Sequence, residues 1–399
     1  MSRRTEATNT ISTYGWVERA FHWAVAVMIV TAIGLGLVAE DLPFGTDAEL
    51  ARKAFVFSFH KSVGVAVFFV ALARIAWALS QPRPRPLHGG AEGMLAALVH
   101  WLLYGSLVLV PLLGWTEHAA TTGFAPIWWP FGQGLPFVPQ DAALAETLAV
   151  LHVVFGKVLI GALLLHVVGT VKHVVVDRDA TFARMWRGEE PEAVSVARAH
   201  GLPLAGALAI WAVTLGVGLW LVPQEAEAVA GRAEVAGAAN WAVEDGTLSI
   251  TVAQMGSPVT GSFADWQAAI DFDEEVRADG THGSVEVSVA TGSLTLGSVS
   301  DQAKSADFLD AGAFPVATFT AEILPAEEGY VADGTLSLRG VEVPLSLPFT
   351  LSLEGERAAM TGQAVLDRRD FGMGETYPDE SSVGFGVTVD VALNAMRTE

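Results

Sequence analysis

Five long apolar segments occupy the first 222 residues and restrict the fold more than any other feature. A helix needs about 20 apolar residues to cross the roughly 30 Å hydrocarbon core of a bilayer. The segments are, to within a few residues, 18–39, 56–80, 94–117, 148–176 and 203–222. The first is too long for a signal peptide, and polar Glu18, Arg19 and His22 mark its entry. We therefore expect an all-α transmembrane bundle with five spans.

The loops between these segments differ in basic residues, which sets the expected orientation. Lysine and arginine gather before residue 20, in residues 81–93 and in residues 172–202, whereas residues 117–147 contain none. Because basic loops stay in the cytoplasm, we expect a multi-pass membrane protein with a cytoplasmic N-terminus and a C-terminal domain outside. In a bacterium this means the inner membrane and the periplasm. The aromatic 117–147 loop is expected to fold back over the bundle, as a plain interfacial loop or as part of a substrate site.

Histidines recur inside the predicted spans at matched depths. His152 and His166 are fourteen residues apart, which is about 21 Å along one face of a helix. His22 enters the first span at the depth of His166, and His60 enters the second at the depth of His152. Ionisable groups inside a bilayer are costly and mark functional sites. Two stacked imidazole pairs are what two haem irons need, so we predict His22, His60, His152 and His166 as axial ligands.

Other residues compete for these roles or support them. His100 enters the third span at the depth of His22 and is the main rival as a ligand, or else a quinone-site proton donor or a packed polar group. Gly64, Gly114 and Gly161 would let a flat macrocycle approach the backbone. His88, His200 and His282 fall in loops and are expected to be solvated. The chain has no cysteine, so a CxxCH site for covalent haem is excluded.

Residues 12–188 resemble the bacterial cytochrome b561 family. The resemblance rests on RAFHW, FHKSVG, HWLLYGSLVLVPLLGW and LHVVFGKVLIGALLLHVVGTVKH, with DRDATFARMWRG after the fourth span. It implies four helices that hold two haems b and exchange electrons with the quinone pool. Some relatives oxidise superoxide, and others carry electrons to partner proteins. The fifth span lies outside the family pattern and is interpreted as a tether.

Three basic residues are expected near the haems, namely Arg19, Lys61 and Lys157. Each either pairs with a haem propionate or attracts a small anion such as superoxide. For the two lysines, snorkelling toward the membrane surface is a further alternative.

The chain after Val222 has a different composition. It holds 29 acidic and 8 basic residues, so the whole net charge of −21 lies there. Such a charge repels nucleic acid, and no run in this part is long enough to cross a bilayer. From Trp241 onward, apolar and polar residues alternate in about eight short stretches separated by Gly, Asp and Pro, which predicts an all-β antiparallel barrel or sandwich.

Residues 240–396 resemble the YceI-like family. The matching segments are WAVEDGTLSITV, GSFADWQAAIDFD, SDQAKSADFLDAGAFPVATFTAE, GTLSLRGVEVPLSLPFTL and LDRRDFGMG. The resemblance implies a lipocalin-like barrel that holds a polyprenyl lipid or an isoprenoid quinone. The sequence departs from the family at AQMGSPV, where relatives commonly have a histidine, so the preference for a ligand head group is open.

The expected organisation is a dihaem transmembrane domain in residues 1–188, a fifth helix and linker in residues 189–239, and a periplasmic barrel in residues 240–399. The leading hypothesis is a quinone-linked b-type cytochrome with a tethered isoprenoid-binding barrel, and superoxide oxidase activity is one form of it. The alternatives are a non-enzymatic polyprenyl-lipid carrier or sensor with a haem anchor, and an electron carrier to a periplasmic partner protein. The cofactors expected are two haems b and, in the barrel, ubiquinone or another isoprenoid.

Overall fold

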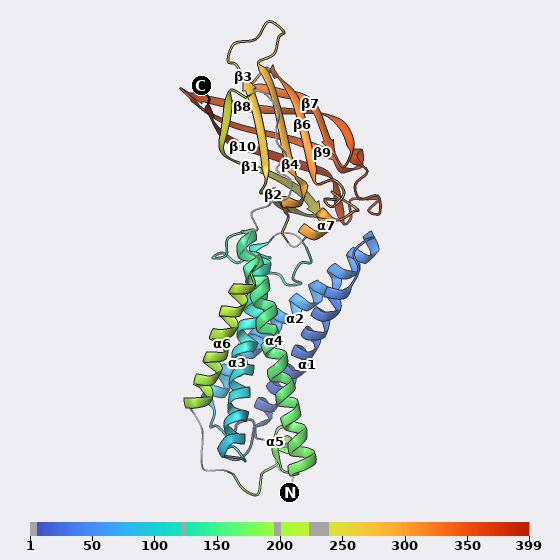
Figure 1. Ribbon diagram of the computed structural model, residues 1–399. Helices are drawn as coiled ribbons and strands as arrows, with labels where there is room; N and C mark the ends of the chain where they lie inside the picture. The colour runs from blue at the N-terminus through green and yellow to red at the C-terminus, as the bar shows by residue number, and fades with distance from the viewer. Residues whose placement is uncertain (1–5, 122–123, 195–200, 223–238, 298, 399) are drawn as a thin grey trace. The chain divides into compact units, whose positions relative to one another are not determined.

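The computed structural model describes residues 6–121, 124–194, 201–222, 239–297 and 299–398 (Figure 1). Two compact units make up the chain. The first contains residues 1–41, 56–120 and 126–222, and the second contains residues 42–55, 121–125 and 223–399. His200, which was expected in a loop, lies outside the described residues.

Five helices in the described part of the chain are long and apolar enough to cross a membrane, as expected. They are α1 (Trp16–Asp41), α2 (Asp47–Ser80), α3 (Gly90–Ala120), α4 (Ala142–Lys172) and α6 (Gly201–Leu221). Asp141 caps the N-terminus of α4 because its side chain accepts from the Leu144 N–H. After α4, a π-helical turn, η1 (His173–Asp177), and the short α5 (Thr181–Trp186) follow. The second helix begins nine residues before the predicted span.

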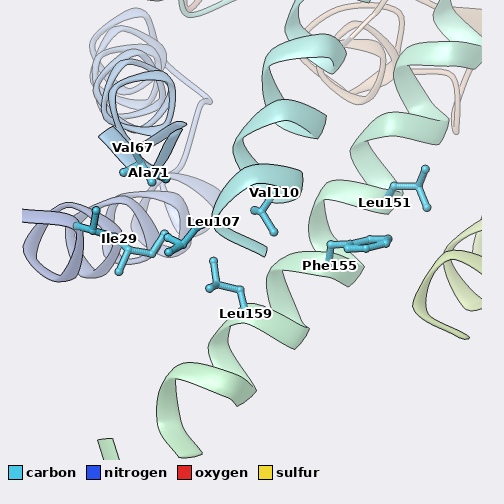
Figure 2. Close-up of a cluster of buried hydrophobic side chains, with 9 residues drawn as sticks. Ile29, Val67, Ala71, Leu107, Val110, Leu151, Phe155 and Leu159 are labelled. Atoms are coloured by element: carbon cyan, nitrogen blue, oxygen red, sulfur yellow. The ribbon is translucent and has the colours of Figure 1, made fainter. Parts of the chain in front are cut away.

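A buried apolar cluster joins the first four helices (Figure 2). The cluster consists of Val25, Ile29, Val67, Ala71, Leu107, Val110, Leu151, Phe155 and Leu159. Leu159 is seven residues from both His152 and His166, so this core lies between the two histidine positions of α4. Packed apolar side chains therefore separate the two ends of the bundle.

The fifth spanning helix packs closely against the bundle, beside α3 and α4 in Figure 1. Gly105 of α3 leaves room for the Trp211 ring, because a Cβ there would lie 1.9 Å from it. Gly218 likewise admits Leu151, at 2.5 Å from the position of a Cβ. Ala207 is fully buried between Leu102 and Ala162. The helix is thus an integral member of the bundle as well as a connection to the second half of the chain.

The second half of the chain forms one closed antiparallel sheet. Its strands are β1 (Trp241–Gln254), β2 (Ser257–Phe263), β3 (Trp266–Phe272), β4 (Gly283–Ala290), β5 (Leu294–Thr295), β6 (Val316–Pro325), β7 (Tyr330–Leu338), β8 (Val341–Glu354), β9 (Arg357–Asp367) and β10 (Val383–Arg397). Three short helices, η2 (Thr291–Ser293), α7 (Ser300–Lys304) and η3 (Arg368–Phe371), lie in its connections.

Closure follows from pairing between the first and last strands. The order is β10-β9-β8-β7-β6-β4-β3-β1-β2-β5, and β10 also pairs with β1. Two residues separate β2 from β3, and both pair with β1, so together they make one strand of the barrel. Only η2 separates β4 from β5, and these two likewise make one strand. The ten strands therefore form an eight-stranded barrel. Alternate residues face its interior, which confirms the lipocalin-like barrel expected from the period-two pattern.

Candidate functional site

His60 of α2 and His152 of α4 face each other inside the bundle. Their ring centroids are 6.2 Å apart and the ring planes are nearly perpendicular, at 86°. Each Nδ1 lies on a main-chain carbonyl, with Ala32 O at 2.8 Å from His60 and Val110 O at 3.0 Å from His152. A carbonyl only accepts, so both Nδ1 atoms carry the proton and both Nε2 atoms keep a lone pair. This arrangement is usual for metal-ligating histidines.

Two glycines make room for these rings. A Cβ on Gly36 would lie 2.9 Å from the His60 ring, and a Cβ on Gly114 would lie 2.9 Å from the His152 ring. Gly114 was expected to admit a macrocycle, whereas the structure shows it beside a histidine. Gly64 and Gly161 have no other atom within 4 Å of a built Cβ, which leaves room beside both helices.

His22 of α1 and His166 of α4 form the second pair predicted from the sequence. Their ring centroids are 6.1 Å apart. The rival His100 of α3 also reaches His166, with centroids 5.1 Å apart, and its Nδ1 lies 2.6 Å from Ala96 O. The structure therefore brings three imidazoles together here and two at the other end of α4. We call His22, His100 and His166 the histidine triad.

The spacing of both predicted pairs fits a metal ion between them. Imidazole nitrogens bind metal ions at roughly 2.0–2.1 Å, so two rings on opposite sides of one ion have centroids about 6 Å apart. The observed separations are 6.2 and 6.1 Å. The backbones of helices α3 and α4 lie close together, whereas helices α1 and α2 contact α3 and α4 less closely. The donor set and spacing thus fit haem.

A buried ion pair lies beside the triad. The Arg74 Nε is 3.4 Å from the Glu18 carboxylate, and its Nη2 is 3.4 Å from His22 Nδ1. Glu18 is only 3% exposed, and its second oxygen has no hydrogen-bond partner among the described residues. The guanidinium also lies over the Tyr104 ring. The sequence analysis missed Arg74, although a cation inside an apolar span is a signal that could have found it.

Lys61 belongs to a polar chain next to His60. Its Nζ lies 3.2 Å from His118 Nδ1, and His118 Nε2 lies 2.9 Å from the Gln133 side-chain oxygen. The loop that carries Gln133 also binds α2, since the Trp128 N–H donates to Ser62 Oγ. The aromatic loop after α3 thus folds back onto the bundle.

The other two predicted cations lie elsewhere. Arg19 donates to the Trp186 carbonyl at 3.1 Å and packs against Gly188. Lys157 is exposed on the surface of α4. Lys61 is therefore the predicted cation with the most direct connection to a histidine pair.

Two of the loop histidines are less solvated than expected. His88 stacks on His173, and both lie within 2.8 Å of Asp179 Oδ2. Burial alone would raise the pKa of Asp179, but hydrogen bonds from Thr181 and His88 hold it at about 2. His282 is buried beside Phe272 and bonds to Asp273 O. The prediction for His282 was wrong, because a loop residue can pack under a barrel rim.

The barrel encloses an apolar cavity of about 300 Å³. Its walls come from the inward residues of the strands, among them Trp241, Phe319, Leu347, Met360 and Val391. Besides the indole rings, the polar side chains among the described residues that line it are Gln254, Thr291, Gln302 and Arg368. A cavity of this size and lining suits a small apolar ligand or part of a long one.

These features define a membrane protein with paired imidazoles in its helices and an apolar-lined barrel. Residues 13–188 match the family described as prokaryotic cytochrome b561, and residues 241–395 match the YceI-like domain. The chain therefore joins a prokaryotic cytochrome b561 domain, which implies b-type haem, to a YceI-like domain.

Individual proteins that resemble this chain each cover less than half of it. Cytochrome b561 homolog 2 of Escherichia coli K12 is 26% identical over 45% of this chain and 93% of its own length. The probable superoxide oxidase CybB of Yersinia pestis is 24% identical over 43% of this chain and 94% of its own. The crystal structure of BcnA from Burkholderia cenocepacia is 28% identical and covers 38% of this chain and 96% of its own, with a TM-score of 0.35.

Proposed function

We propose that the protein is a dihaem membrane cytochrome that exchanges electrons with the quinone pool, and that its barrel holds an isoprenoid lipid. The observation that carries the proposal is the pair of matched imidazole sites at opposite ends of α4, each with ring centroids about 6 Å apart. In this account His60 and His152 hold one haem b, and His22 and His166 hold the other. Bound haem supplies one-electron chemistry.

The chain's own residues prepare these sites. Carbonyls of Ala32 and Val110 accept from Nδ1 of His60 and His152, which leaves Nε2 of each ring as the atom that can bind a metal ion. The apolar cluster around Leu159 excludes water from the region between the two sites. Arg74, which is paired with Glu18, holds its guanidinium beside the triad.

The orientation proposed is a cytoplasmic N-terminus and a periplasmic barrel in the bacterial inner membrane. The distribution of basic residues supports it. A reporter enzyme that is active only in the periplasm, fused after Glu399, should be active. Activity of a reporter that works only in the cytoplasm would contradict this orientation.

Superoxide is the electron donor to test first. One relative is named a probable superoxide oxidase, and Lys61 places a cation next to His60. Each superoxide loses one electron to become dioxygen, so two superoxide ions and two protons convert one quinone to its quinol. The purified chain, supplied with a superoxide generator and a soluble ubiquinone, should form quinol in that ratio.

The side chain of Lys61 offers a matched comparison for that test. Lys61→Met should lower kcat/KM for superoxide by about tenfold and weaken its salt dependence, because local charge concentrates a small anion. Lys157→Met removes the same charge from an exposed position on α4 and should have little effect. Equal loss in both variants would contradict a local role for Lys61.

Two other functions give different results. An electron carrier for a periplasmic partner protein would react slowly with superoxide and quinone. A lipid carrier or sensor with a haem anchor would show no turnover at all, although the barrel cavity would still be filled. Extraction and mass analysis of lipid that co-purifies with the full chain should find an isoprenoid. Phospholipid alone would contradict the proposed barrel function.

A further inference from the structure

Four side chains that can bind a metal ion converge just after α4, outside both histidine sites described above. They are His88, His173, Asp177 and Asp179, and one ligand atom from each lies within 4.8 Å of the others. His88 comes from the connection between α2 and α3, and the other three follow the end of α4. The cluster therefore joins two segments that are more than 80 residues apart in the sequence.

The backbone after α4 positions three of these side chains. The helix ends in the π-helical turn η1, a feature that is frequent at functional sites. Arg178 then has a φ of 53°, and the Asp179 N–H bonds back to His173 O at 3.2 Å. The Thr181 N–H donates to Asp179 Oδ1 at 2.7 Å. Asp179 is thus held by Oδ1, and its Oδ2 faces the imidazoles.

The contacts among the four side chains are short and centre on two oxygens. Asp179 Oδ2 lies 2.7 Å from His88 Nε2 and 2.8 Å from His173 Nδ1. Asp177 Oδ2 lies 2.9 Å from the same His173 nitrogen. A zinc ion binds nitrogen and oxygen ligands at roughly 2.0–2.2 Å, which places neighbouring ligand atoms about 3.3 Å apart in a tetrahedron. Shifts of about half an ångström would therefore admit an ion between these atoms.

The charges around the cluster favour a divalent cation. Glu92 Oε1 lies 3.8 Å from His173 Nε2, the ring nitrogen that faces away from the two aspartates. Lys172 Nζ lies 2.5 Å from Glu92 Oε1 and 2.6 Å from Asp177 Oδ2. With neutral imidazoles, three carboxylates and one ammonium sum to −2. A carboxylate on the second ring nitrogen is also the usual support of a metal-bound histidine.

We propose that His88 Nε2, His173 Nδ1, Asp177 Oδ2 and Asp179 Oδ2 bind one zinc ion. Two imidazoles and two carboxylates suit zinc, whereas magnesium and calcium prefer sites made of oxygen alone. The bound ion fastens the connection before α3 to the turn after α4, and in a chain without cysteine it does so without thiolate ligands. This site is separate from the proposed haem sites and from the barrel.

Zinc binding to the purified full chain in detergent tests the proposal. The chain should carry its haem, so that the imidazoles of the other sites are occupied, and it should first be stripped of loosely bound metal with a chelator. Equilibrium dialysis against zinc chloride should then find one zinc per chain. His88→Ala should weaken binding by at least about tenfold, since changes even around metal ligands cost that much. Equal affinity in the native chain and His88→Ala, or no zinc binding by the native chain, would overturn the proposal.

A matched pair of carboxylate variants locates the ion. Asp179→Asn should weaken zinc binding by at least about tenfold, whereas Asp301→Asn, at a fully exposed aspartate, should bind zinc like the native chain. An equal loss in both variants would show that zinc is held by the general negative charge of the chain and would contradict a built site.

X-ray absorption at the zinc edge reads the ligands directly. The spectrum of the native chain should show four nitrogen or oxygen ligands at about 2.0–2.1 Å, with the outer scattering of two imidazole rings. Scattering from no imidazole would overturn the assignment. An excess of magnesium chloride should leave the zinc in place, and displacement of zinc by magnesium would contradict the proposed nitrogen ligands.

Thermal unfolding supplies an independent readout. A ligand that binds only the folded chain raises its unfolding temperature. Zinc should therefore raise the unfolding temperature of the native chain and leave that of His88→Ala unchanged. An equal rise in both would contradict the role of His88 as a ligand.

Discussion

The two ends of α4 hold histidines in different ways. His60 and His152 are oriented by main-chain carbonyls and fit against glycines, with no charged side chain in their hydrogen bonds. At the other end, three imidazoles gather beside the buried Arg74–Glu18 pair. A backbone carbonyl has a fixed position and no titration, whereas a triad with a charged neighbour has several arrangements. The backbone therefore fixes the His60–His152 site, whereas the geometry of the histidine triad depends on which side-chain contacts form.

The largest expected effect separates His22 from His100. In the proposed account, His22→Ala removes one haem, because His166 then has no ligand opposite it at 6.1 Å. His100→Ala should retain both haems and shift only one reduction potential. Haem content per chain and a redox titration would be measured for each variant. If His100→Ala loses a haem and His22→Ala keeps both, then His100 rather than His22 is the ligand opposite His166.

Breaking the buried ion pair should weaken only the triad end. Glu18→Gln leaves the Arg74 charge buried without its partner, a change that costs about 3–5 kcal/mol. Thermal unfolding followed at the haem bands should show earlier loss of one haem. The double variant Glu18→Gln/Arg74→Met removes both charges and should recover most of the stability. Failure of this recovery would show that the pair does more than neutralise charge.

A methyl group beside His152 should affect only the His60–His152 end of α4. The Cβ added in Gly114→Ala would lie 2.9 Å from the His152 ring, so the ring must move. We expect about a tenfold faster loss of one haem to a haem acceptor, within the range known for changes around metal ligands. Gly216→Ala on α6, where no atom lies within 4 Å of a Cβ, should leave haem retention unchanged.

The smallest effect expected is a pH dependence at Asp179. Its folded pKa of about 2 lies below the ordinary value of 3.8. A lowered carboxyl pKa contributes stability above about pH 4, which is lost as the pH falls toward 2. Asp179→Asn should therefore cost about 1–2 kcal/mol at pH 7, after allowance for partial exposure, and this cost should shrink as the pH falls through about 2. The fully exposed Asp301 supplies the control variant, Asp301→Asn, which should change the free energy of unfolding at pH 7 by less than about 0.5 kcal/mol.

Much of this architecture could be predicted from the sequence. The five spans follow from apolar length, and the barrel strands follow from period-two alternation. The fourteen-residue spacing of His152 and His166 indicated where imidazoles would meet, and the structure does bring His22 and His60 to them. Their role as haem ligands stays a prediction.

The features that the sequence did not predict depend on contacts between distant segments. Gly36 contacts the His60 ring from another helix, and no local pattern marks it. Arg74 is related to Glu18 only through the packing of α1 on α2.

The most direct test of the central claim is haem content in His152→Ala and His166→Ala. The native chain should contain two low-spin haems b with two histidine ligands each. Each variant should retain one haem, and the retained haems should differ in reduction potential, because each variant empties a different end of α4. Retention of both haems in either variant, or loss of the same haem in both, would contradict the account.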